Sequence, residues 1–114
     1  MQTIAVVDYG MGNLRSVVNA LEVVGDKRDR VLLTSDPQQL GQADRVVFPG
    51  QGAARDCMRA IDEYGLREAI VSAAASRPFL GICMGMQVLI DFSEENQGTE
   101  CLGIFAGKVK YFGE

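Results

Sequence analysis

The chain has 114 residues, the size of a single domain. Hydrophobic residues make up 47% of it and charged residues 23%, which is typical of a soluble globular protein and excludes a disordered chain. The net charge of -4 argues against nucleic-acid binding, and the longest uncharged stretch, residues 78–90, is too short to cross a bilayer.

Short apolar runs alternate with helical patterns along the chain. Strands are predicted at residues 4–7, 31–33, 46–48 and 79–82. Helical segments are predicted at residues 14–24, at the short turn opened by Asp36-Pro37, at residues 55–76 with an interruption near Gly65, and at residues 84–92. Asn13 is a suitable N-cap for the first helix and Gly25 lies where its C-cap belongs. Residues 93–103 read as a polar loop, and residues 104–105 with 109–112 as a hairpin.

This alternation predicts an α/β fold with three layers, in which a mostly parallel sheet is flanked by helices. Ligand sites in such sheets form beyond the carboxyl ends of the strands. Three glycine-rich turns occupy such ends, at residues 10–13, 50–52 and 81–85. We therefore expect these three turns to converge in space.

The segment Gly81-Ile-Cys-Met-Gly85 has the pattern of a nucleophile elbow, a tight turn that presents one side chain above the end of a sheet. Cys83 is the candidate nucleophile, because a thiolate is intrinsically reactive. The backbone N–H of Met84 is a candidate donor to an oxyanion, and the Pro49-Gly50-Gln51-Gly52 turn could supply a second donor. Gln87, one helical turn after Cys83, could bind a polar edge of a substrate.

Other features have simpler interpretations. The chain contains no histidine, so the usual general base is missing and a metal site is disfavoured. Cys57 and Cys101 read as small buried hydrophobic residues. The turn at residues 10–13 lacks the last glycine of a dinucleotide motif, where Arg15 stands instead. The acidic residues of segment 91–95 read as a solvated loop.

Together these motifs resemble the class I glutamine amidotransferases. The resemblance covers the whole chain and rests on four stretches: residues 4–17, residues 49–58, residues 80–87 and residues 93–95. The elbow alone points to the superfamily. The opening Asp8-Tyr-Gly-Met-Gly-Asn13 resembles the glutaminase subunits of imidazole glycerol phosphate synthase, from histidine biosynthesis, more than other members.

The resemblance implies that Cys83 attacks the carboxamide of glutamine and forms a glutamyl thioester, releasing ammonia. It implies that the Gly50–Gly52 strand and the Met84 N–H form the oxyanion hole, and that Gln87 contacts bound glutamine. It implies no cofactor, no metal and a (β/α)8-barrel cyclase subunit as partner. Gln51 departs from the valine common in the family, which puts the details of the oxyanion strand in doubt.

The histidine and glutamate of the family's triad lie near the C-terminus of its full domain. Residues 1–114 therefore read as the N-terminal portion of a single amidotransferase domain, with essentially no glutaminase activity. A half-sheet leaves an edge and an apolar face uncovered, so we also expect self-association. The sequence enters its first strand without a basic leader, which predicts a cytoplasmic protein.

Three alternatives remain open at this point. The chain could be a non-enzymatic, flavodoxin-like binding module in which Cys83 is only structural. It could be the glutaminase subunit of another amidotransferase. It could also be a relative that uses an elbow cysteine on aldehydes or peptides.

Overall fold

A computed structural model describes residues 1–112 of the chain. Its main sheet has four parallel strands in the order β2-β1-β3-β4. The strands are β1 Thr3–Val7, β2 Arg30–Thr34, β3 Arg45–Phe48 and β4 Phe79–Gly81. The helices are α1 Leu14–Val24, α2 Pro37–Gln42, α3 Ala54–Glu63, α4 Arg67–Ser76 and α5 Met84–Gln87. The predicted parallel α/β sheet is thus confirmed.

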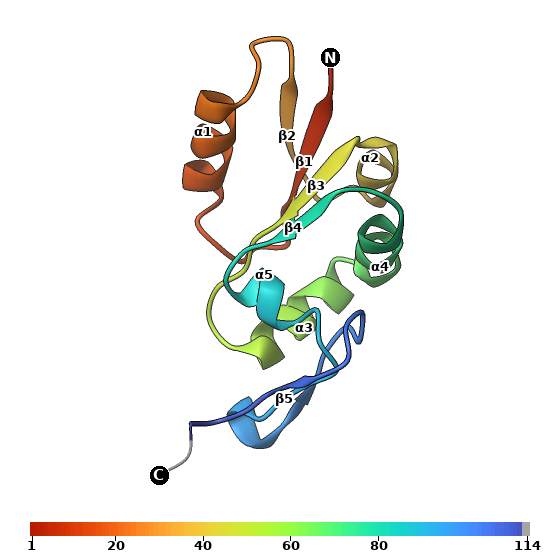
Figure 1. Cartoon of the computed structure of the whole chain (residues 1–114). Helices are drawn as coiled ribbons and strands as arrows, with labels where there is room; N and C mark the ends of the chain where they lie inside the picture. The colour runs from red at the N-terminus through yellow and green to blue at the C-terminus, as the bar shows by residue number, and fades with distance from the viewer. Residues whose placement is uncertain (113–114) are drawn as a thin grey trace.

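Helices lie on both faces of this sheet (Figure 1). Helix α1 lies on one face, α2 and α4 lie on the other, and α3 and α5 lie beyond the carboxyl ends of the strands. The predicted caps are confirmed: the Asn13 side chain accepts from Ser16 N, Asp36 caps α2 with Pro37 at its start, and Gly25 ends α1. None of the helices formed by residues 1–112 has both the length and the apolar character needed to cross a bilayer.

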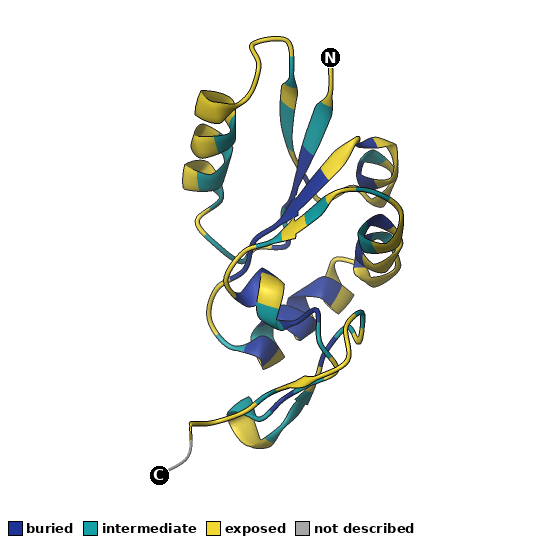
Figure 2. Cartoon of the chain, viewed as in Figure 1, coloured by how far each residue is buried: buried dark blue, intermediate teal, exposed yellow. Residues whose placement is uncertain are grey.

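The two faces of the sheet are buried unequally. One continuous core lies between the sheet and helices α2 and α4, and it extends past the ends of the strands to α3. It includes Tyr9, Phe48, Ile61 and Ile70. Helix α1 has no buried residue at all, whereas α3 has five (Figure 2). The sheet is therefore well packed on one face and only partly covered on the other.

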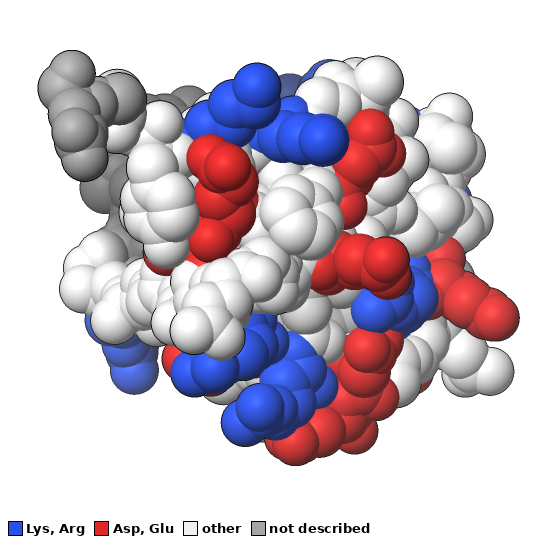
Figure 3. Space-filling model, turned by 90° about the horizontal axis from the view of Figure 1, so that it is seen from below, with Lys and Arg blue, Asp and Glu red and all other residues white. Residues whose placement is uncertain are grey.

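A second, three-stranded sheet lies at the far end of the molecule, with strand order β6-β5-β7. Its elements are β5 Phe92–Ser93, the 3-10 turn η1 Glu95–Gln97, β6 Thr99–Glu100 and β7 Lys108–Val109. Seen from this end, side chains of both charges are mixed over the surface (Figure 3).

Three sequence predictions were wrong here. The helix predicted at residues 84–92 ends at Gln87, and β7 pairs in parallel with β5 instead of forming a hairpin with residues 104–105. The helix ends early because of tertiary hydrogen bonding: the carbonyls of residues 88–90 accept from the amides of residues 102–105. The predicted loop at residues 93–103 accordingly contains β6 and η1.

Candidate functional site

Cys83 lies between β4 and α5 in a backbone conformation that few residues adopt. Its φ is 56° and its ψ is -120°, and its side chain is exposed. A non-glycine residue in such a region costs about 1–3 kcal/mol and persists only when its surroundings hold it there. The turn is closed by hydrogen bonds from Gly85 N to Ile82 O, at 2.9 Å, and from Met86 N to Cys83 O, at 3.0 Å. This geometry is that of an elbow that presents the thiol.

The two glycines of the elbow are required sterically. A Cβ atom on Gly85 would lie 1.8 Å from the carbonyl oxygen of Phe48, and one on Gly81 would lie 2.9 Å from the Cα of Met86. Helix α5 therefore approaches the end of β3 more closely than any side chain permits. This close approach explains why the pattern has a glycine two residues before Cys83 and another two residues after it.

The strain at Cys83 predicts that Cys83→Gly will stabilise the fold. Glycine adopts positive φ readily, so this substitution should raise the free energy of unfolding by about 1 kcal/mol. Cys83→Ala keeps a Cβ and is the matched control, with an expected change of less than about 0.5 kcal/mol. Urea denaturation followed by circular dichroism measures both variants. Equal stabilities of the two would show that the backbone at residue 83 is unstrained.

The turn that follows β3 is held at four successive carbonyls, each by a different group. The bonds are Ile82 N to Phe48 O at 3.0 Å, Tyr9 Oη to Pro49 O at 2.7 Å, Met84 N to Gly50 O at 3.3 Å, and Cys57 Sγ to Gln51 O at 3.5 Å. Phe48, Pro49 and Gly50 are buried, whereas Gln51 and Gly52 are exposed. The first half of the turn is therefore part of the core, and its second half, Gln51 and Gly52, reaches the surface beside the elbow.

The three glycine-rich turns meet, as predicted. A Cβ on Gly12 would lie 3.4 Å from the Cβ of Pro49 and 3.5 Å from the nitrogen of Gly50. A Cβ on Gly50 would lie 2.8 Å from the nitrogen of Gly85 and 2.5 Å from the hydroxyl of Tyr9. Gly50 therefore lies in contact with both of the other turns.

A comparison with protein families shows which family the chain belongs to. The family model described as "Glutamine amidotransferase class-I" matches residues 5–110. The chain belongs to the class I glutamine amidotransferases.

Curated relatives agree with this membership. The chain is 57% identical over 114 residues to the imidazole glycerol phosphate synthase subunit HisH of Pseudomonas syringae, covering 100% of the chain and 53% of the relative. It is 65% identical over 109 residues to the subunit of the same name in Thiobacillus denitrificans, covering 96% of the chain and 47% of the relative. The chain spans about half the length of the curated relatives it matches. These similarities do not favour the flavodoxin-like binding module.

A solved structure supports the fold independently. A crystal structure from Listeria monocytogenes, described as that of a peptidase E protein, superposes with a TM-score of 0.63 and covers 80% of this chain and 50% of the other. The two sequences are 15% identical, so the similarity concerns the fold alone.

The remaining candidate residues of this amidotransferase lie on α5. Met84 is buried, and its backbone N–H, the predicted oxyanion donor, is already bonded to Gly50 O. Gln87 is half-buried, and its N–H donates to Cys83 O at 3.1 Å. Helix α5 has only four residues, so it offers Cys83 a weaker helix dipole than the predicted longer helix would.

Burial governs the protonation of the polar side chains that hold the turn. Burial is the main cause that raises the pKa of the Tyr9 hydroxyl far above its usual range, and the neighbouring Cys57 thiol adds to the shift. Burial likewise raises the pKa of the Cys57 thiol. Both groups are therefore protonated at neutral pH and can donate to the carbonyls they face. In residues 1–112, no group of three histidine, cysteine or carboxylate residues is placed to hold a metal ion.

Glu95 has a structural role that the sequence analysis missed. It is half-buried, and its Oε1 accepts from Ala54 N at 3.4 Å and from the Ser93 hydroxyl at 3.5 Å. Helix α3 begins at Ala54 after Ala53, which has no side chain that can cap it. The missing local cap was the signal that a distant side chain must supply one, since the first N–H groups of a helix need partners.

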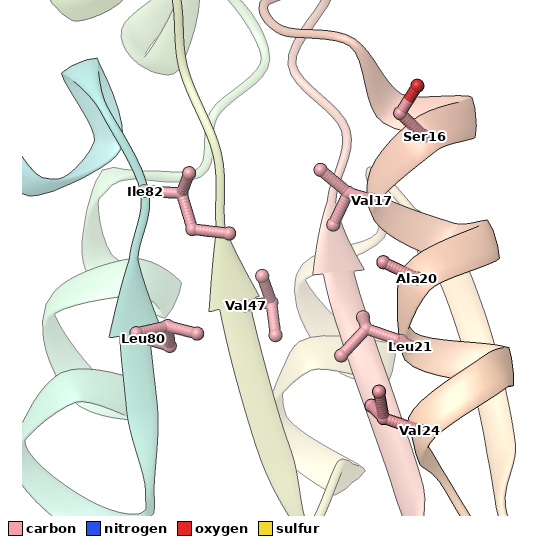
Figure 4. Close-up of a pocket in the computed structure, with 8 residues that line it drawn as sticks. All are labelled: Ser16, Val17, Ala20, Leu21, Val24, Val47, Leu80 and Ile82. Carbon is pink, nitrogen blue, oxygen red and sulfur yellow. The ribbon is translucent and has the colours of Figure 1, made fainter.

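An apolar groove lies on the side of the sheet that α1 covers. This groove has a volume of about 360 Å³ and runs between α1 and the partly covered face of the sheet (Figure 4). Its lining residues are Ser16, Val17, Ala20, Leu21 and Val24 from α1, Val47 from β3, and Leu80 and Ile82 from β4 and the residue after it. Glutamine is polar at both ends, so this groove does not suit it.

Proposed function

We propose that Cys83 is the nucleophile of a glutaminase site that serves imidazole glycerol phosphate synthesis in histidine biosynthesis. The observation that carries this proposal is the elbow itself. Cys83 is exposed at positive φ, and Gly85 packs against the backbone of Phe48 at the start of the Pro49–Gly52 turn. Family membership supplies the reaction class, and the names of the relatives supply the pathway.

In the proposed reaction, the Cys83 thiolate attacks the carboxamide carbon of glutamine. The C–N bond of the amide breaks and ammonia leaves with an added proton, which gives a glutamyl thioester. Water then attacks the thioester, and glutamate and the thiol are released. The sum of the two steps is glutamine plus water to glutamate plus ammonia, so no oxidant or cofactor is needed.

The proposed oxyanion donors are the Met84 N–H and the backbone of the turn formed by Gly50, Gln51 and Gly52, while Gln87 contacts the substrate. The Met84 N–H donates to Gly50 O in the present arrangement. This bond must open before Met84 can donate to an oxyanion. Losing one such donor costs about 2.7–4 kcal/mol of transition-state stabilisation. Because catalysis needs this stabilisation, we propose that the hydrogen bond between Met84 N and Gly50 O opens during the reaction.

Proton transfer is the part of the reaction that these residues do not supply. A cysteine nucleophile of this kind is activated by an adjacent base, which is most often an imidazole, and the sequence contains no histidine. We therefore expect essentially no steady release of ammonia from glutamine by the purified chain. The site is better tested by binding and by covalent capture than by turnover.

Covalent capture tests the proposed site. A chloromethyl ketone analogue of glutamine should alkylate Cys83 much faster than iodoacetamide does, when each rate is divided by the rate of the same reagent with a free thiol. Free glutamine should slow alkylation by the analogue. Cys57 and Cys101 are buried and Cys83 is exposed, so intact mass followed by peptide mapping can assign the site. Cys83→Ser is the control. Labelling at Cys83 with no preference for the analogue and no protection by glutamine would reject the glutamine site.

The proposed partner is a (β/α)8-barrel cyclase subunit that receives the ammonia. Support comes from the relatives, which are named as subunits of imidazole glycerol phosphate synthase. Size-exclusion chromatography of the chain mixed with a cyclase subunit from such an enzyme checks this partnership. Co-elution is the expected result, and separate elution at micromolar concentrations would contradict it.

A second proposal concerns self-association through the groove between α1 and β4. Val23 and Val24 of α1 are 83% and 80% exposed, and Leu80 on the edge strand β4 is 56% exposed. Exposed apolar surface beside an unpaired strand edge favours pairing with a second copy of the chain.

Sedimentation velocity tests the self-association. We expect a concentration-dependent dimer or larger species, and the double variant Val24→Glu, Leu80→Lys should shift it to monomer. Val71→Lys on α4, which changes an exposed apolar residue on the opposite side of the sheet, is the matched control and should leave the association unchanged. A monomer at high concentration in the unchanged chain would contradict the proposal.

A further inference from the structure

Tyr9 is a buried aromatic residue whose hydroxyl reaches the candidate site. It lies two residues after the end of β1, and its side chain has no exposed surface. Its ring packs on Phe48, with centroids 5.3 Å apart, and its hydroxyl donates to Pro49 O at 2.7 Å. One side chain thus joins the first glycine-rich turn to the turn that carries the proposed oxyanion donors.

We propose that Tyr9 is a positioning residue that sets the direction of the backbone N–H groups of the Pro49–Gly52 turn. The consequence for glutamine rests on the proposed function, whereas the effect on the turn does not. Tyr9 touches no substrate in this proposal and acts only through the peptide that it holds.

Because the peptide bond is planar, a bond to the Pro49 carbonyl also fixes the N–H of Gly50. The carbonyl of Pro49 and the N–H of Gly50 belong to one planar trans unit and point in opposite directions. When the Tyr9 hydroxyl fixes Pro49 O, it therefore also fixes the Gly50 N–H on the side away from Tyr9. Without this bond the buried carbonyl of Pro49 would lack a partner, and the peptide would gain freedom to rotate.

The Tyr9 hydroxyl also restricts Gly50 by direct steric contact. A Cβ on Gly50 would lie 2.5 Å from the Tyr9 hydroxyl, so the hydroxyl lies directly against the Cα of Gly50. The same Cβ would lie 2.8 Å from the nitrogen of Gly85 and 3.1 Å from the Cβ of Met84. Tyr9 and the elbow residues Met84 and Gly85 therefore lie together against the side of Gly50 where a Cβ would point, and they leave no room there for the turn to shift.

Cys57 holds the carbonyl of the residue that follows Gly50. Its thiol lies in the core beside Tyr9 and donates to Gln51 O at 3.5 Å. Two buried side chains thus hold the carbonyls before and after Gly50, while the carbonyl of Gly50 itself is held by the backbone N–H of Met84. The Gly50 carbonyl must release the Met84 N–H before Met84 can donate to an oxyanion. The carbonyls on either side of it, those of Pro49 and Gln51, stay held, and Tyr9 holds the first.

Tyr9→Phe is the decisive variant, because it removes the hydroxyl and keeps the ring that packs on Phe48. We expect the rate of Cys83 alkylation by the chloromethyl ketone analogue of glutamine to fall at least about fivefold, since a buried acceptor is left without its donor. The rate with iodoacetamide, which needs no oxyanion donors, should change less than about twofold. Tyr111→Phe removes an exposed hydroxyl and is the matched control, with no expected change in either rate.

The outcomes separate this proposal from the proposed function. Parallel changes in both rates, or none, for Tyr9→Phe would overturn the positioning role. If the unchanged chain shows no preference for the analogue, the glutamine site fails and nitrogen-15 relaxation decides on Tyr9. Increased motion at Gly50 and Gln51 in Tyr9→Phe, with the core strands unchanged, supports the role, and unchanged motion there overturns it.

A second variant keeps the test valid if Tyr9→Phe does not fold. Tyr9→4-aminophenylalanine retains a donor at the same place on the ring. It should fold and keep the alkylation preference of the unchanged chain. A folded variant of this kind that has lost the preference would overturn the positioning role.

Discussion

Replacing Gly85 with alanine is expected to destabilise the protein by about 3 kcal/mol or more, the largest effect expected for any glycine within residues 1–112. The added Cβ would lie 1.8 Å from Phe48 O, 2.8 Å from Phe48 C and 3.1 Å from Pro49 C. All three atoms belong to backbone, so no side chain can rotate away to make room. Helix α5 or the end of β3 would have to move.

Gly41→Ala is the matched control for this substitution. Gly41 lies in α2 at negative φ, and a Cβ there would meet nothing within 4 Å. Alanine at this position should stabilise the helix by about 0.5–1 kcal/mol. Equilibrium urea unfolding measures both variants, and a loss below about 1 kcal/mol for Gly85→Ala would show that α5 does not lie against β3 as described.

Replacing Phe48 with alanine should destabilise the protein by about 3–5 kcal/mol, because a fully buried aromatic ring is lost and a cavity remains. The ring of Phe48 packs between Tyr9, with centroids 5.3 Å apart, and Phe79, with centroids 5.8 Å apart. It therefore joins β3 to the first glycine-rich turn and to the strand that leads into the elbow. Selective alkylation of Cys83 should fall together with stability.

Two controls define the cause of this loss. Phe48→Leu keeps an apolar side chain in the site and should cost about 1.5 kcal/mol or less. Val71→Ala removes methyl groups from a side chain that is 38% exposed and should change stability by about 0.5 kcal/mol or less. Equal losses for the alanine and leucine variants at position 48 would contradict the packing described.

The sequence predicted the fold well wherever local chemistry decides the structure. Apolar runs marked the four strands, and the side chains of Asn13 and Asp36 marked two helix starts. The glycines at 81 and 85 predicted the close approach at the elbow, because only a residue without a Cβ fits such a turn. The convergence of the three turns followed from a general property of parallel sheets.

The sequence failed where distant hydrogen bonds replace local ones. The pattern of residues 84–92 fits a helix, but the carbonyls of residues 88–90 accept hydrogen bonds from the amides of residues 102–105. Strand β7 pairs with β5 across the loop that contains β6, and no local signal specifies such a partner. The capping of α3 by Glu95 belongs to the same class, since its donor and acceptor lie far apart in the sequence.

The glutamine site at Cys83 is tested most directly by titrating glutamine into nitrogen-15-labelled Cys83→Ser and following the amide resonances. We predict saturable shifts at residues 50–52, Met84 and Gln87, and none along α1. Asparagine, one methylene shorter, should give weaker shifts at the same residues. No shift at these amides, or shifts confined to the groove beside α1, would contradict a glutamine site built by the elbow and the turn that faces it.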